Sequence, residues 1–171
     1  MPVFLDSTRD SVHQILNEGG KIYSVVTGSQ SLAANEYLAL ELANPADSDK
    51  MIGIIRIEGG STGNVSIDVL RNASINVSGI SLNPRNRNWS FADASSITAE
   101  YVTQASDPTS GGELLTTLVH SGGTLSVSYD GEYVIPGEST NKQFTIRAQN
   151  VSSQSNVVSI VVTWIEVIKT N

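Results

Sequence analysis

The sequence predicts an all-β protein, an antiparallel β-sandwich or jelly roll of about ten strands with a short N-terminal arm helix. From residue 21 onward, short apolar or alternating runs recur at intervals of about 8–15 residues, and clusters of Gly, Asn, Asp and Pro separate them. Helical patterns do not alternate with these runs, so the βαβ units of parallel-sheet folds are excluded. We therefore divide the chain into an arm, residues 1–20, and a β-sandwich domain, residues 21–171.

The arm is predicted to contain one helix over residues 7–18, which Gly19-Gly20 ends. Such a helix of about three turns is too short to be stable alone in water, so it must dock on something. Because a sandwich of about ten strands has little internal need for more apolar residues, we expect the arm to dock on a neighbouring subunit or on the underlying shell or filament. The residues expected to make that contact are Phe4, Leu5, Val12, Ile15 and Leu16.

The first half of the domain is predicted to hold strands at residues 21–27, 37–42, 50–58, 64–71 and 74–77. The run at 50–58 is almost continuously apolar, which is typical of a strand covered on both faces. The glycine-rich segment 59–63 lacks the Lys of a phosphate-binding loop and is predicted to be a hairpin loop.

The second half begins with a predicted loop at residues 83–88. Further strands are predicted at residues 98–104, 113–120, 124–130, 133–135, 143–149 and 156–167. Asp130-Gly131 is predicted to form a tight turn between two of them. The best-patterned strands predict a core of Leu38, Leu40, Ile54, Ile57, Ile67, Val69, Ile160 and Val162.

Composition excludes several kinds of chemistry. The chain has no cysteine, which excludes disulfides, thiol nucleophiles and Cys-ligated zinc, and its two histidines, His13 and His120, are far apart. The formal net charge of −7 argues against nucleic acid and anionic membrane as partners. No run is long and apolar enough for membrane insertion, and the first residues lack the features of a secretory signal. We expect no metal and no cofactor. Charged residues make up only 16% of the chain, and Ser, Thr and Asn are abundant, as is common on extracellular assemblies and virion parts. We therefore expect a location in a virion or on an extracellular surface.

Neither pair of neighbouring carboxylates predicts a catalytic or calcium site. Asp47 and Asp49 form one pair, and Asp130 and Glu132 form the other, but neither has a third acid nearby. Aspartate is common in turns because its side chain can mimic one. His120 precedes Ser121, yet the Gly-x-Ser-x-Gly elbow of serine hydrolases does not occur. We therefore predict no catalytic residues and no enzyme.

A small basic and aromatic patch is formed by Arg85, Arg87, Trp89 and Phe91. Nucleic-acid binding needs more positive charge than this chain carries. An Arg-x-Arg pair can instead clamp carboxylates of a neighbour, so Arg85, Arg87 and Trp89 are candidates for a subunit contact. The two aromatic side chains are expected to seal the core.

Four segments carry a resemblance to a known group. They are the apolar strand and glycine-rich turn at 54–67, Leu-Arg-Asn-Ala at 70–73, Ser-Gly-Ile-Ser-Leu-Asn-Pro-Arg-Asn at 78–86, and the terminal strand with Trp-Ile-Glu at 157–166. Over residues 21–167 the chain resembles small virion structural proteins of tailed phages, the head decoration and head fibre proteins. It is also similar to jelly-roll subunits of endospore appendages, whose N-terminal arm inserts into the next subunit. Those arms carry cysteines, which this chain lacks.

The resemblance implies a sandwich subunit that forms homo-oligomers, contacts other virion or filament subunits and binds no cofactor. The function expected first is therefore that of a non-enzymatic, self-assembling virion component. The alternatives are a subunit of a bacterial extracellular or spore-surface filament assembled through the arm, and a carbohydrate-binding module. Sandwiches with exposed aromatic residues bind glycans, but aromatic residues make up only 6% of this chain.

Overall fold

The computed structural model describes residues 9–137 and 142–169, which form one helix and twelve strands. The helix is α1 (Arg9–Glu18). The strands are β1 (Ile22–Val26), β2 (Gln30–Leu32), β3 (Tyr37–Asn44), β4 (Lys50–Ser61), β5 (Val65–Ile75), β6 (Ile80–Leu82), β7 (Arg85–Asn86), β8 (Thr98–Gln104), β9 (Thr109–His120), β10 (Gly123–Ile135), β11 (Lys142–Asn150) and β12 (Asn156–Ile168).

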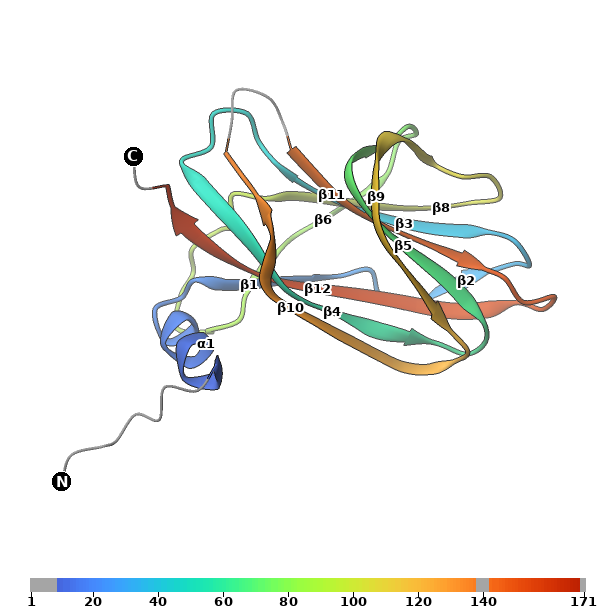
Figure 1. Cartoon of the computed structure of the whole chain (residues 1–171), viewed down its shortest axis with the longest axis horizontal. Coiled ribbons are helices and arrows are strands. Elements are labelled where there is room, and N and C mark those ends of the chain that lie inside the picture. The colour runs from blue at the N-terminus through green and yellow to red at the C-terminus, as the bar shows by residue number, and fades with distance from the viewer. Residues whose placement is uncertain (1–8, 138–141, 170–171) are drawn as a thin grey trace.

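Two antiparallel sheets pack face to face (Figure 1). The first sheet has the order β10-β4-β12-β1-β7, with β2 also paired to β12, and the second has the order β6-β8-β3-β11-β5-β9. Strand pairs are nested along the chain: β1 with β12, β3 with β11, β4 with β10 and β5 with β9. Such nesting results when one long hairpin is rolled into two sheets, which is the jelly roll. The predicted all-β sandwich is confirmed.

The excursion between β5 and β9, residues 76–108, covers one side of the sandwich. Its strand β8 pairs with β3, β6 pairs with β8, and β7 pairs with β1, so it extends both sheets beyond the nested strands. On the opposite side, β9 pairs only with β5 and β10 only with β4 among the described strands. The sandwich therefore has one covered side and one side with two long edge strands.

The predicted core is confirmed. All eight predicted core residues are at most 3% exposed, and they lie between the two sheets. Trp164 of β12 is also fully buried, and its ring stacks on that of Tyr23 with centroids 6.3 Å apart. In β4, Ile52, Ile54 and Ile57 belong to the core cluster, whereas Ile55 is buried outside it, as expected for a strand covered on both faces.

The end of α1 is confirmed at Glu18, and its predicted start at residue 7 lies outside the described residues. Gly20 has φ +65°, the Lys21 N–H donates to the Leu16 carbonyl, and the Gly20 N–H donates to Asn17. This pattern is the Schellman motif, which needs a left-handed residue that glycine supplies at least cost. The two glycines thus form a helix cap.

The predicted hairpin loop at residues 59–63 is wrong. Gly59 and Gly60 lie inside β4, where Gly59 is opposite Ile160 of β12 and Leu125 of β10. The connection after Ser61 leads from β4 in the first sheet to β5 in the second, so it closes no hairpin. Glycine is needed here for close approach of neighbouring strands, and the sequence signal for that is the same as for a turn.

The predicted turn at Asp130-Gly131 is also wrong. Both halves of β10 pair with β4, and the register shifts between Ser128 and Tyr133. Asp130 and Gly131 have φ of 50° and 83°. They form a bulge within one long strand, since a left-handed Asp-Gly pair serves a bulge as well as a hairpin.

β9 begins at Thr109, four residues before the predicted start at residue 113. The other differences concern short elements. The predicted strand at 74–77 is the end of β5, and the predicted loop at 83–88 contains the two-residue strand β7. Strands β2 and β6, three residues each, had no prediction. Elements this short lack the periodicity on which a prediction depends.

Candidate functional site

The end of α1 and the predicted subunit-contact loop lie side by side. The Asn88 side-chain amide donates to the carbonyls of Asn17 at 3.0 Å and Glu18 at 3.3 Å, and the Asn86 amide donates to Gly20 at 2.9 Å. The last carbonyls of a helix have no partner within the helix. Two asparagines about seventy residues away in the chain therefore fix the end of α1 on its own domain.

The loop is also held by its own backbone. The Asn88 N–H donates to Asn86 Oδ1 at 2.9 Å, and the Ser90 N–H donates to Asn88 Oδ1 at 3.0 Å. The Arg87 N–H donates to the Ile22 carbonyl of β1 at 2.8 Å. Asparagine side chains favour such turns because they mimic a backbone carbonyl. These hydrogen bonds give the loop at residues 86–90 a defined conformation.

The expectation that Trp89 and Phe91 seal the core is wrong. Trp89 is 97% exposed, and Phe91 is half-buried over Gly20, where an added Cβ would lie 2.4 Å from the Phe91 ring. The Phe91 ring therefore packs against Gly20, in the cap of α1, and not in the core. Burying a large ring is favourable, so complete exposure of the tryptophan in an ordered loop is unusual.

Trp89 borders a pocket of about 450 Å³ in this loop, together with Asn83, Arg85 and Asp93. These three polar side chains are exposed, and they make no hydrogen bond or ion pair with a described residue. Arg87 points elsewhere: its Nη1 donates to Thr163 Oγ1 at 3.3 Å, in a groove between α1 and the first sheet. The structure therefore joins Arg85 with Trp89 and separates both from Arg87.

The far end of the same loop is anchored by a buried carboxylate. Glu166 of β12 is 5% exposed, and its Oε1 accepts from Trp164 Nε1 at 3.0 Å and from the Ser95 hydroxyl. Its Oε2 accepts from the N–H and the hydroxyl of Ser96, both at 3.2 Å. The Trp-x-Glu pattern thus places two inward side chains on one strand face, where they fix the chain before β8.

The residues of the predicted assembly arm are only partly described. Phe4 and Leu5 lie outside the described residues, as does the side chain of Val12. Ile15 is 57% exposed, and Leu16 is half-buried. The arm contact with a neighbour therefore stays a prediction, which now concerns a helix whose end is held on its own domain.

The isolated carboxylates and His120 remain scattered. Asp47, with φ 59°, lies in the turn between β3 and β4, and Asp130 lies in the β10 bulge. His120 Nε2 is 3.1 Å from the Gly123 carbonyl at the end of β9. Within residues 9–137 and 142–169, no three His, Cys, Asp or Glu side chains are grouped so that they would hold a metal ion.

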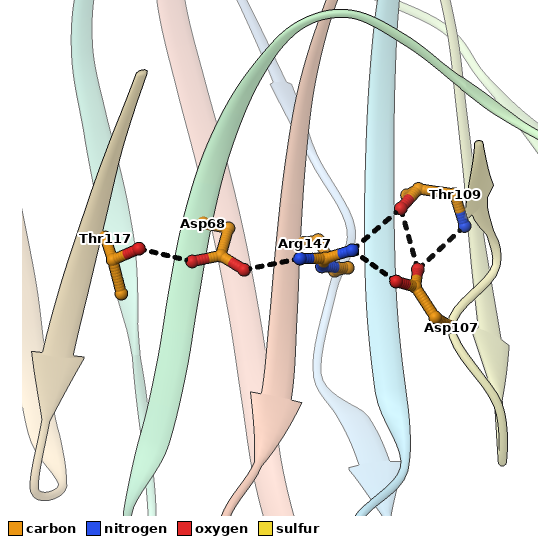
Figure 2. A network of polar contacts seen from close by, with 5 residues as sticks. All are labelled: Asp68, Asp107, Thr109, Thr117 and Arg147. Atoms are coloured by element: carbon orange, nitrogen blue, oxygen red, sulfur yellow. Dashed lines mark hydrogen bonds and ion pairs between the residues drawn. The ribbon is translucent and has the colours of Figure 1, made fainter. Parts of the chain in front are cut away.

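A polar network on the outer face of the second sheet has a structural explanation (Figure 2). Arg147 of β11 binds Asp68 of β5 at 2.6 Å, Asp107 of the β8–β9 loop, and Thr109 at 3.1 Å. Asp68 in turn accepts from Thr117 of β9 at 2.6 Å. Asp68 and Asp107 raise the pKa of the Arg147 guanidinium against the opposing effect of burial. Both aspartates bind the same guanidinium, that of Arg147, so the network holds the β8–β9 loop against strands β11 and β5.

A second outer-face group, Glu41 of β3, predicts a pH effect. Glu41 is buried, and its Oε2 accepts from the Ile75 N–H at 2.7 Å. Burial raises the pKa of Glu41 above its ordinary 4.5, the Ile75 hydrogen bond lowers it, and the charge of Glu100 adds a smaller increase. The folded state thus binds this proton more tightly, so this group favours folding below pH 4.5 and loses that effect as pH rises through the folded pKa.

We expect Glu41→Gln to gain stability relative to the parent protein as pH rises from 4 to 8, because glutamine keeps the acceptor without the charge. Urea unfolding across that range is the measurement. Glu100→Gln is the control and should change the slope in the same direction but less. Parallel pH profiles for the parent and Glu41→Gln would contradict the effect of burial.

No protein-family model matches the chain, and no curated protein matches its sequence. No helix in the described part of the chain is long and apolar enough to cross a membrane.

Proposed function

We propose that the protein is a non-enzymatic, self-assembling structural protein, a decoration or fibre component of a virion, whose copies associate through edge strand β9. The observation that carries the proposal is the nature of this edge. β9 has twelve residues, and it exposes Val119 by 85% and Leu114 by 56%. Long edge strands with exposed apolar residues pair readily with another chain, so natural proteins cover or interrupt them.

The other edges have such protection. β6 and β7 have three and two residues, and β10 carries the bulge at Asp130-Gly131 with Glu132 beside it. β9 has one acid, Glu113, which is paired with Arg71. β9 has a register shift of its own, between the residues that pair with Val69 and Leu70. Its regular and uncharged segment is therefore Thr116–His120, which carries the exposed Val119.

Charge also favours contact at β9. Each copy carries a formal net charge of −7, so copies repel one another. Repulsion is smallest where the contacting surfaces carry no net charge. Antiparallel pairing of β9 with β9 of a second copy is two-fold symmetric and closes into a dimer, which can then be a unit of a larger shell or fibre.

A second candidate is the filament subunit assembled through its arm. Ile15 supports it, since this side chain is 57% exposed although its helix is fixed on the domain at its end. An arm that contacts the next copy makes a head-to-tail interface, which generates open filaments unless the rotation closes. The two candidates therefore differ in both contact residues and the size of the assembly.

Sedimentation velocity of the full chain and three lysine variants tests the proposal. We expect the parent protein to sediment above the 18.2 kDa monomer and Val119→Lys to be a monomer. Val151→Lys, which changes an exposed valine of a loop, should sediment as the parent does. A monomeric parent protein at about 100 μM, a concentration well above the Kd of stable interfaces, would contradict self-assembly. Dissociation by Ile15→Lys but not by Val119→Lys would favour the arm filament instead.

A further inference from the structure

We propose that the pocket beside Trp89 is a glycan-binding site that takes a neutral pyranose. The inference is independent of assembly through β9, since the pocket is lined by the 83–94 segment, which pairs with β1 and is hydrogen-bonded to the end of α1. Figure 1 shows α1 and β1 next to each other. The tryptophan ring supplies one flat apolar surface, and Asn83, Arg85 and Asp93 supply free polar groups around it. The volume of about 450 Å³ lies within the range of small-ligand pockets.

The chemistry of a pyranose matches this arrangement. A pyranose has one face of C–H groups that stacks on an aromatic ring, and a rim of hydroxyls that both donate and accept hydrogen bonds. Arg85 offers only donors, Asp93 only acceptors, and Asn83 both. Such a mixture suits hydroxyls better than it suits a group that only accepts, such as a phosphate or carboxylate.

The charges indicate a neutral sugar. Arg85 and Asp93 cancel at the rim of the pocket, and the whole chain is acidic. A uronic acid or sulfated sugar would gain one ion pair with Arg85 and meet repulsion from Asp93 and from the net charge. A neutral hexose or N-acetylhexosamine forms no ion pair with Arg85 and is not repelled by Asp93 or by the net charge of the chain.

The site is also built before the ligand arrives. One end of the loop is fixed by Asn86 and Asn88 on the helix cap, and the other by Ser95 and Ser96 on Glu166. Little ordering is then needed on binding, which removes a large part of the cost of association. An ordered loop that holds a tryptophan 97% exposed gains no folding free energy from that ring, so its contribution lies in contact with a ligand.

A protein partner is the competing occupant, and the surroundings of Trp89 disfavour it. Protein hot spots are tryptophans enclosed by contacts that exclude water. Here the neighbours within the pocket that are not aromatic are polar or small, including Ala92 and Ala94. Phe91 and Pro84 also line the pocket, but both are half-buried, so Trp89 is the one large apolar side chain of the pocket that is fully exposed. A single exposed ring presents too little apolar area for a protein interface.

The two tryptophans provide a direct measurement. Trp164 is fully buried and Trp89 is almost fully exposed, so a small quencher such as acrylamide reaches mainly Trp89. The screen uses neutral hexasaccharides of glucose, galactose, mannose and N-acetylglucosamine at millimolar concentration. We expect at least one of them to protect the fluorescence of Trp89 from quenching. A hexasaccharide of a uronic acid serves as the charged comparison and should protect at least tenfold less well.

Variants separate this site from the assembly surface. In gels that contain the matching polysaccharide, we expect the full chain to be retarded, Trp89→Ala to lose at least about tenfold in affinity, and Asp93→Ala to lose less. In the quenching measurement with a short oligosaccharide, where multivalent binding does not contribute, Val119→Lys is the matched control and should bind as the parent does. Trp89→Ala should keep the parent's sedimentation coefficient. The proposal is overturned if no neutral glycan protects Trp89 at about 10 mM, if the uronic acid protects better, or if Trp89→Ala binds unchanged. Loss of assembly in Trp89→Ala would instead show a protein contact.

Discussion

Replacing Gly59 by alanine is expected to destabilise the fold by more than about 3 kcal/mol, the largest effect predicted for a single methyl group in this chain. Gly59 lies inside β4 with φ +145°, a backbone conformation that residues with a side chain rarely adopt. An added Cβ would lie 2.0 Å from the Ser159 carbonyl oxygen on β12. The atoms that this Cβ would meet all belong to the backbone of β12, a central strand, so they cannot move away without breaking the sheet.

Gly63→Ala is the matched control, four residues away. Its added Cβ would meet only the Asn156 side chain at 3.5–3.8 Å, an ordinary van der Waals distance, and its φ is not positive. We expect the control to unfold within about 0.5 kcal/mol of the parent. Urea unfolding followed by circular dichroism compares the three proteins. Equal midpoints for Gly59→Ala and Gly63→Ala would mean that the strands can separate at this position at little cost.

This pair of glycines illustrates how far the sequence predicts the fold. Long strands with a clear period, such as β12, were predicted within a residue or two, because burial of one face sets the alternation. The segment at 59–63 was misplaced because glycine marks both turns and close strand contacts, and only the partner strand distinguishes them. The turn predicted at Asp130-Gly131 was wrong for the same reason. Both halves of β10 pair with β4, and this long-range pairing cannot be seen in the local sequence.

The candidate site was predictable in composition but not in arrangement. Arg85 and Trp89 were singled out as a basic and aromatic pair, and they do border one pocket. The roles of Asn86 and Asn88 depend on helix carbonyls far away in the chain, and the only available signal was that a helix end needs donors. Trp89 was expected to seal the core, and Trp164 was not among the predicted core residues. The available signal was the alternation of the last strand, which places Trp164 on the same face as Ile160 and Val162.

Replacing Glu166 by leucine is expected to destabilise the protein by about 2–4 kcal/mol although leucine is more apolar. The indole N–H of the fully buried Trp164 and the N–H of Ser96 would lose their acceptor. A buried donor left without a partner costs its full desolvation free energy, which exceeds the net gain of the bond that it made. Glu132→Leu, at an exposed site on β10, is the control and should change stability by less than about 0.5 kcal/mol.

A double-mutant cycle with Trp164→Phe assigns that cost to the indole N–H. Phenylalanine keeps an aromatic ring but has no donor, so Glu166→Leu should cost less in the Trp164→Phe background by about 1–2 kcal/mol. Additive effects would show that the indole bond contributes nothing and that the serines carry the cost. Because Ser95 and Ser96 end the loop that bears Trp89, Glu166→Leu should also speed hydrogen exchange at residues 89–97 while Glu132→Leu does not. Stability of the core and order of the exposed pocket would then depend on the same carboxylate.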